Sequence, residues 1–212
     1  MRFPRLFVLV VIGVLLAPLN ALADGPVKIV VLGDSLVAGY GLAAGRDFPA
    51  RLEAALRAGG KDVSVVNAGV TGDTASGGLS RFERYVPEDA SGLILELGIN
   101  DAMRRIDPQK TERALRGILD KAKERGMAVL IAGMVAPGSS GKDYAARFDP
   151  IFGRLAEDYG TLLYPFFLDG VADEPELKLA DGIHPNPEGV EVLVKGILPQ
   201  AEDLVERAEA AQ

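Results

Sequence analysis

The sequence predicts an α/β fold in which five parallel strands form a sheet covered by helices on both faces. Two observations support this prediction. Strand-like apolar segments alternate with segments of helical periodicity over most of the chain. Strands that alternate with helices are joined by right-handed crossovers, which produce a parallel sheet. The 212 residues contain no internal repeat or separating linker, so we expect one domain.

The first half of the chain contains three predicted strands. Residues 27–32 form a buried strand because their apolar, largely β-branched run is continuous and stops at Gly33. The later elements of this half are a helix over residues 48–58, a strand over residues 63–66, a short helix over residues 79–85 and a strand over residues 92–97.

The second half opens with the longest of the internal helices, over residues 108–125. Asp107 is a suitable N-cap, Pro108 fits the first turn and Gly126 ends the helix. The later elements are a strand over residues 127–132, a helix over 144–159, a short strand over 161–163 and a closing helix over 187–208.

Residues 1–23 have the pattern of a secretory signal peptide. Arg2 and Arg5 give the positive start, residues 6–16 are apolar, and residues 21–23 read Ala-Leu-Ala, which fits a cleavage site. The apolar run is short for a membrane span. We therefore expect cleavage after Ala23, a mature domain over residues 24–212 without a stable membrane span, and a periplasmic or secreted location. An uncleaved N-terminal anchor is the alternative.

Composition narrows the possible functions. Removing residues 1–23 takes away two arginines and no acidic residue, so the net charge moves from −7 to −9. Such an acidic chain lacks the basic stripe that holds phosphate backbones, and we expect no nucleic-acid partner. The sequence contains no cysteine, which excludes a disulfide, a thiolate nucleophile and a thiolate metal site.

Polar residues stand where several predicted strands end. Ser35 follows the first strand, residues 67–74 follow the second, and Asn100 follows the third. Asp181 and His184 lie in the loop before the last helix. Because ligands bind at the carboxyl ends of the strands in such sheets, we expect these residues to form one site.

The residue types at this site fit nucleophilic acyl transfer. A serine such as Ser35 needs a base, and His184 is the only histidine in the chain. Asp181, three residues earlier, can bind Nδ1 of the imidazole and leave Nε2 free. The Gly72 N–H, the Asn100 amide and the Ser35 N–H can donate to an oxyanion. Taken singly, each segment also fits an ordinary turn or helix cap.

Together the segments resemble the four sequence blocks of the SGNH hydrolases, also called the GDSL family. The blocks are Gly33-Asp34-Ser35-Leu36, Gly72 within residues 67–74, residues 98–101 and residues 181–184. Within the family the chain is most similar to the bacterial thioesterase I, lysophospholipase L1 and arylesterase group, over nearly all of the mature sequence.

The resemblance implies a three-layer α/β/α sandwich with a flavodoxin-like strand order. It also implies that Ser35 is the nucleophile, His184 the base and Asp181 the residue that orients it, with Ser35, Gly72 and Asn100 as the oxyanion hole. The implied function is a serine esterase of the bacterial cell envelope that cleaves acyl or aryl esters through an acyl-enzyme. No cofactor or metal is implied. We expect a monomer whose partner is a small acyl or aryl ester, lysophospholipids included.

The chain departs from the family pattern beside the oxyanion hole. Ile99 replaces a residue that is often small, and Ala102-Met103 stand where glycine is common. Residues 134–141 align with a loop that covers the substrate in the group. We expect substrate contacts from five residues: Ile99, Met134, Val135, Pro137 and Ile183.

Other functions fit the residues less well. The G-x-S-x-G elbow of α/β-hydrolases is absent, and no glycine motif for phosphate or flavin binding occurs in the right context. A metal-dependent hydrolase would gather Asp34, Asp73, Asp101, Asp181 and His184, but we expect the first three to brace loops or cap helices. A carbohydrate O-acetyl esterase with the same machinery is the main alternative, although the apolar residues near the motifs and the lack of tryptophan favour acyl or aryl groups.

Overall fold

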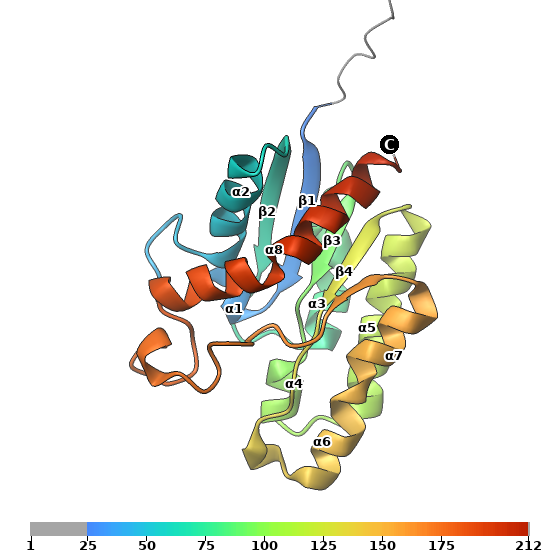
Figure 1. Ribbon diagram of the computed structural model, residues 1–212. Coiled ribbons are helices and arrows are strands. Elements are labelled where there is room, and N and C mark those ends of the chain that lie inside the picture. The colour runs from blue at the N-terminus through green and yellow to red at the C-terminus, as the bar shows by residue number, and fades with distance from the viewer. Residues whose placement is uncertain (1–24, 212) are drawn as a thin grey trace, which may run out of the picture.

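The structure, a computed structural model, describes residues 25–211, which form a central sheet between two layers of helices (Figure 1). Residues 1–23, the predicted signal peptide, lie outside the described residues. The strands are β1 (Val27–Gly33), β2 (Val63–Gly69), β3 (Gly92–Leu95), β4 (Ala128–Ala132) and β5 (Leu162–Tyr164). They are parallel, in the order β2-β1-β3-β4-β5. The predicted three-layer fold with flavodoxin-like order is confirmed.

Helices cover both faces of this sheet. Helices α2 and α8 pack together on one face, and α3, α5 and α7 lie on the other (Figure 1). The α-helices are α1 (Ser35–Ala38), α2 (Phe48–Ala58), α3 (Ala75–Tyr85), α4 (Ile99–Met103), α5 (Pro108–Glu124), α6 (Lys142–Phe148), α7 (Pro150–Tyr159) and α8 (Pro187–Glu209). Two short 3₁₀ helices are η1 (Gly138–Ser140) and η2 (Pro175–Leu177). Among the described residues, no helix has both the length and the apolar character needed to cross a membrane.

The strand order creates a crevice at one edge of the sheet. The chain runs from β1 to β2 on one side and then returns to place β3 on the other side of β1. Gly33 is in register with Gly69, and Leu32 with Leu95, so the three strands end close together. Loops that leave the carboxyl ends of strands on either side of such a reversal diverge and leave room for a ligand.

Several boundaries differ from the prediction; β2, for example, ends at Gly69 rather than at residue 66. The expected helix over residues 144–159 is two helices, α6 and α7, because Pro150 lacks an N–H and starts a new helix. Strand β3 ends at Leu95 rather than at residue 97. Helix α3 begins at Ala75 rather than at residue 79 and includes Gly78, where a Cβ atom would lie 2.2 Å from Cδ1 of Leu97. Close packing of α3 against Leu97 therefore explains the glycine at this position.

Candidate active site

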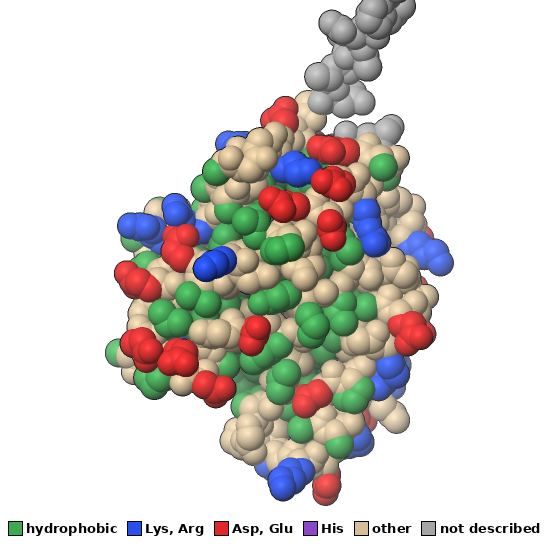
Figure 2. Space-filling model, viewed as in Figure 1, with side chains coloured by type: hydrophobic (Ala, Val, Ile, Leu, Met, Phe, Trp, Pro, Cys, Tyr) green, Lys and Arg blue, Asp and Glu red, His purple; other side chains and the backbone are tan. Residues whose placement is uncertain are grey.

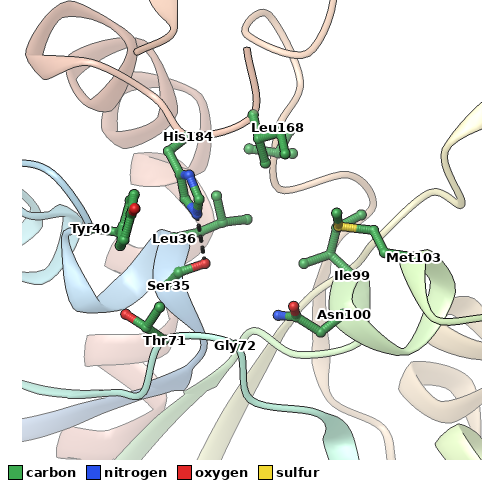
Figure 3. A pocket seen from close by; sticks show the side chains of 11 residues that line it. Ser35, Leu36, Tyr40, Thr71, Gly72, Ile99, Asn100, Met103, Leu168 and His184 are labelled. Carbon is green, nitrogen blue, oxygen red and sulfur yellow. Dashed lines mark hydrogen bonds between the residues drawn. The ribbon is translucent and has the colours of Figure 1, made fainter. Parts of the chain in front are cut away.

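Ser35, His184 and Asp181 form a continuous chain of hydrogen bonds at the carboxyl edge of the sheet, and Figure 3 shows the bond between Ser35 and His184. Nε2 of His184 lies 2.9 Å from Oγ of Ser35. Nδ1 of His184 lies 2.7 Å from Oδ2 of Asp181. This is the geometry in which an imidazole takes the proton of a serine hydroxyl while a carboxylate stabilises the resulting imidazolium.

Ser35 is presented by a turn from β1 into the short helix α1. Asp34 caps this helix, because its Oδ1 accepts a hydrogen bond of 3.0 Å from the Leu36 N–H. Ser35 is thus the first helical residue, where backbone N–H groups have no partner within the helix. Its side chain is largely buried but faces the cleft (Figure 3). The backbone N–H of Ser35 is therefore placed to donate to a carbonyl oxygen bound in the cleft.

His184 and Asp181 lie on a loop that is held in place by hydrogen bonds between its own residues. Oδ1 of Asp181 accepts hydrogen bonds from the N–H groups of Ile183 (2.9 Å) and His184 (3.0 Å). These bonds, the Ile183 bond above all, together with the His184 side chain, lower the pKa of the Asp181 carboxyl to about 2. Leu179 donates its N–H to the His184 carbonyl at 2.8 Å and closes the loop. Asp181 consequently stays ionised at neutral pH.

Asn100 and Gly72 face the same cleft as Ser35 (Figure 3). Asn100 lies in α4, which starts directly after Gly98, and its Nδ2 donates to Oδ2 of Asp34 at 2.9 Å. An amide nitrogen carries two protons, so the second remains for a substrate oxygen. Gly72 adopts a left-handed φ of 78°, which favours glycine, and its carbonyl accepts a bond of 2.8 Å from Nη2 of Arg104. The three predicted oxyanion donors therefore border one cavity.

Two buried carboxyl groups lie beneath this site. Asp34 and Glu96 have no exposed surface, and Oε2 of Glu96 accepts a hydrogen bond of 3.1 Å from the Asp34 N–H. Burial raises the pKa of Asp34 to about 6 although Leu36 and Asn100 donate to it. Burial, and next the charge of Asp34, raise the pKa of Glu96 well above its usual range. Burial therefore favours the neutral form of Glu96, whose carboxyl supports the turn carrying Ser35 by accepting from the Asp34 N–H.

The raised pKa of Glu96 should make the free energy of unfolding depend on pH. In the unfolded chain this carboxyl loses its proton near its ordinary pKa of 4.5, whereas in the folded protein it keeps the proton to higher pH. Between the pKa of Glu96 in the unfolded chain and its higher pKa in the folded protein, the wild type should therefore lose about 1.4 kcal/mol of unfolding free energy per pH unit. Glu96→Gln removes this loss, so the variant should gain stability relative to wild type as pH rises from 4 to 8.

Urea unfolding of both proteins at several pH values measures this difference directly. A difference in unfolding free energy that stays constant with pH would show that Glu96 ionises normally in the fold.

The site opens into two adjoining cavities. The first, of about 260 Å³, contains Ser35 and His184, and the second has about 320 Å³. Both are lined by the same four apolar residues: Ile99, Met103, Leu168 and Ile183. On the face shown in Figure 2, apolar side chains gather along an indentation between the segment that carries η2 and the part built by α4, η1 and α6. The two cavities therefore form one apolar groove that leads away from Ser35.

The structure places the five predicted substrate contacts unequally. Ile99 and Ile183 line both cavities, and Pro137 lines the second. Met134 does not reach the groove: only 1% of its surface is exposed, because it packs in the core just after β4. Val135 is exposed but lines neither cavity. The prediction for Met134 and Val135 is thus corrected, since the backbone turns their side chains away from the groove.

Acidic residues near the site, Asp73 and Asp101, bind different protein groups and do not converge on one position. Asp73 pairs with Nε of Arg81 at 2.6 Å. Asp101 accepts from Oγ1 of Thr111 and from the Ala75 N–H, each at 2.9 Å. Over residues 25–211, no three His, Cys, Asp or Glu side chains gather as a group able to hold a metal ion. These contacts agree with loop bracing by Asp73 and Asp101.

Comparison with known proteins places the chain in the family that the sequence blocks resemble. Residues 31–192 match the model of the GDSL-like Lipase/Acylhydrolase family, which is well over half of the chain. The chain belongs to this family. The "Arylesterase" of Vibrio mimicus is 37% identical over 171 residues, which are 80% of this chain and 86% of the relative.

Two further GDSL relatives cover most of the chain. The "Thioesterase 1/protease 1/lysophospholipase L1" of Escherichia coli K12 is 35% identical over 178 residues, which are 84% of each protein. The crystal structure of AlinE4, described as an SGNH-hydrolase family esterase, is 40% identical with a TM-score of 0.72. The match covers 86% of this chain and 98% of that structure. This chain is thus a GDSL-family carboxylic ester hydrolase.

Several residues of this GDSL site were not predicted from the sequence. Arg81 donates to the carbonyls of Gly33 and Ala68, each at 2.8 Å, and so ties together the ends of β1 and β2. Tyr40 lines the first cavity and Leu168 lines both (Figure 3). Tyr40 stands five residues after Ser35, but nothing in the sequence pattern indicates which way its side chain points.

Proposed function

We propose that this protein is a serine esterase that hydrolyses acyl or aryl carboxylic esters through an acyl-enzyme on Ser35. The observation that carries the proposal is the 2.9 Å contact between Oγ of Ser35 and Nε2 of His184 at the end of an apolar groove. The names of the arylesterase and lysophospholipase relatives support the same class of substrate.

The proposed reaction follows from the geometry of the site. Oγ of Ser35 attacks the ester carbonyl while Nε2 of His184 takes its proton, and Asp181 stabilises the imidazolium. The N–H groups of Ser35 and Gly72 and the amide of Asn100 bind the oxyanion. His184 then returns the proton to the departing alcohol. A water molecule, activated by the same imidazole, finally releases the acid and restores Ser35.

The location and assembly of the enzyme are part of the proposal. The N-terminal pattern of residues 1–23 supports export to the periplasm or beyond the cell, with cleavage after Ala23. Ser35, His184 and Asp181 complete their hydrogen-bond chain within one polypeptide, so we propose that the protein acts as a monomer. Thioesters and lysophospholipids are candidate substrates because the same acyl-enzyme chemistry cleaves both.

The groove predicts a preference for longer acyl chains. Each methylene that the groove buries contributes about 0.8 kcal/mol, or about a fourfold gain in kcat/KM. A series of p-nitrophenyl esters should therefore show kcat/KM rising with acyl length until the groove is filled. A lysophospholipid, an acyl-CoA and acetylated xylan, assayed in parallel, separate lipid, thioester and sugar-ester substrates.

Leu168→Ser tests whether the groove carries this preference. Leu168 lines both cavities, whereas an acetyl group occupies only the space next to Ser35. The variant should lose roughly tenfold in kcat/KM for the longest esters and little for the acetate ester, which serves as the internal control. An equal loss for all esters, or highest activity on acetylated xylan, would contradict the proposed acyl groove.

A further inference from the structure

Tyr40 packs its ring against the imidazole of His184. The two ring centroids are 4.4 Å apart and the ring planes are inclined by 35° (Figure 3). Tyr40 nevertheless remains 49% exposed, one of the few large apolar side chains at the surface of the described part of the molecule. A tyrosine so exposed contributes little to the core, so core packing does not explain why its ring stands beside His184.

The backbone around Tyr40 is built for this contact. Gly39 and Gly41, on either side, adopt left-handed φ angles of 77° and 74°, which favour glycine. A Cβ atom at Gly39 would lie 2.6 Å from Cβ of Asp47, and one at Gly41 would lie 2.6 Å from Cδ1 of Leu179. The Tyr40 N–H also donates to the Ser35 carbonyl at 3.2 Å. The turn that follows the nucleophile therefore fixes where the tyrosine ring stands.

The same turn meets the loop that carries the base. Leu179, which packs against Gly41, donates its N–H to the His184 carbonyl. The imidazole is held at one edge by Asp181 and at the other by Ser35, but hydrogen bonds at these two edges leave the ring free to rock about the line that joins them. A ring packed against its face restrains this motion. Asp181 and Ile183 are partly or well exposed, so the loop itself supplies little packing there.

We infer that Tyr40 is a positioning residue that fixes the plane of the His184 imidazole for proton transfer. This inference rests on the proposed function, in which His184 is the base. Tyr40 acts through its ring face rather than its hydroxyl, because the contact in the structure is between the two rings. Aromatic pairs of this kind have a preferred geometry, which a smaller apolar side chain does not reproduce.

The test compares Tyr40→Leu with Tyr40→Phe. Tyr40→Leu should lower kcat for the acetate ester by about 3- to 10-fold, the range set by the strength of aromatic ring pairs, while KM changes little. Tyr40→Phe keeps the ring and should restore most of the rate. Tyr85→Leu, the same change at a partly exposed tyrosine at the end of α3, serves as the matched control and should have no such effect.

Proton NMR gives a readout that does not depend on turnover. His184 is the only histidine in the chain, so its Cε1 proton can be assigned without ambiguity. At a fixed alkaline pH the resonance should move downfield in Tyr40→Leu, because the shielding by the tyrosine ring is lost, and stay near its wild-type position in Tyr40→Phe and Tyr85→Leu.

Failure of this inference differs from failure of the proposed function. An unmoved resonance in Tyr40→Leu, or a rate in Tyr40→Phe as low as in Tyr40→Leu, would overturn the role of Tyr40. Turnover that survives Ser35→Ala would instead overturn the proposed function, and the NMR comparison would still decide whether the two rings are in contact.

Discussion

Replacing Ser35 with alanine should lower kcat for a p-nitrophenyl ester by about 10⁴- to 10⁶-fold. Alanine has no oxygen to attack the carbonyl, so the acyl-enzyme cannot form even though His184 and Asp181 remain bonded to each other. The side chain of Ser35 is small and the change leaves the cap formed by Asp34 intact, so the fold should be preserved. Hydrolysis rates of the purified, folded variant measure the effect.

Ser80→Ala is the matched control for this experiment. Ser80 is exposed on α3, and its Oγ donates to the Gly77 carbonyl of its own helix. The same deletion of one hydroxyl there should leave kcat at the wild-type value. Near-wild-type turnover in Ser35→Ala would exclude Ser35 as the nucleophile.

Asn100→Ala should lower kcat by about 10²- to 10³-fold, equivalent to about 2.7–4 kcal/mol of transition-state stabilisation. The amide faces the cavity that contains Ser35, and its donor matters most when the carbonyl oxygen becomes negatively charged. KM should change much less than kcat, because the lost interaction is strongest in the transition state. Steady-state kinetics on one ester measure both parameters.

Thermal unfolding of Asn100→Ala provides the necessary control. Nδ2 of Asn100 also donates to Asp34, so the variant leaves one acceptor of a buried carboxyl without its donor. A folded variant with unchanged kcat would remove Asn100 from the oxyanion hole. A variant that melts at a much lower temperature would show that Asn100 also stabilises the turn that carries Ser35.

The fold and the contact between Ser35 and His184 could be predicted from the sequence for physical reasons. Buried parallel strands contain continuous apolar runs, such as residues 29–32 here, and glycines and prolines mark the ends of several helices. A single histidine also left one choice for the base of Ser35. The structure brings these two residues together from opposite ends of the described chain.

Side-chain direction in loops could not be predicted in the same way. Met134 and Val135 follow β4 in a segment without regular periodicity, so the sequence does not indicate which of them faces the groove. In the structure neither does, and Leu168 contributes to the lining from a different loop. Glu96 was read as the continuation of a strand, and its burial beside Asp34 depends on contacts between distant segments.

The most direct test of the account is covalent labelling by a p-nitrophenyl phosphonate ester, followed by peptide mass mapping. A serine made nucleophilic by His184 should attack the phosphorus atom and release one p-nitrophenol per protein molecule. The account predicts a single adduct, on Ser35, and loss of esterase activity in proportion to labelling. An adduct on another residue with Ser35 unmodified, or full activity after complete labelling of Ser35, would contradict it.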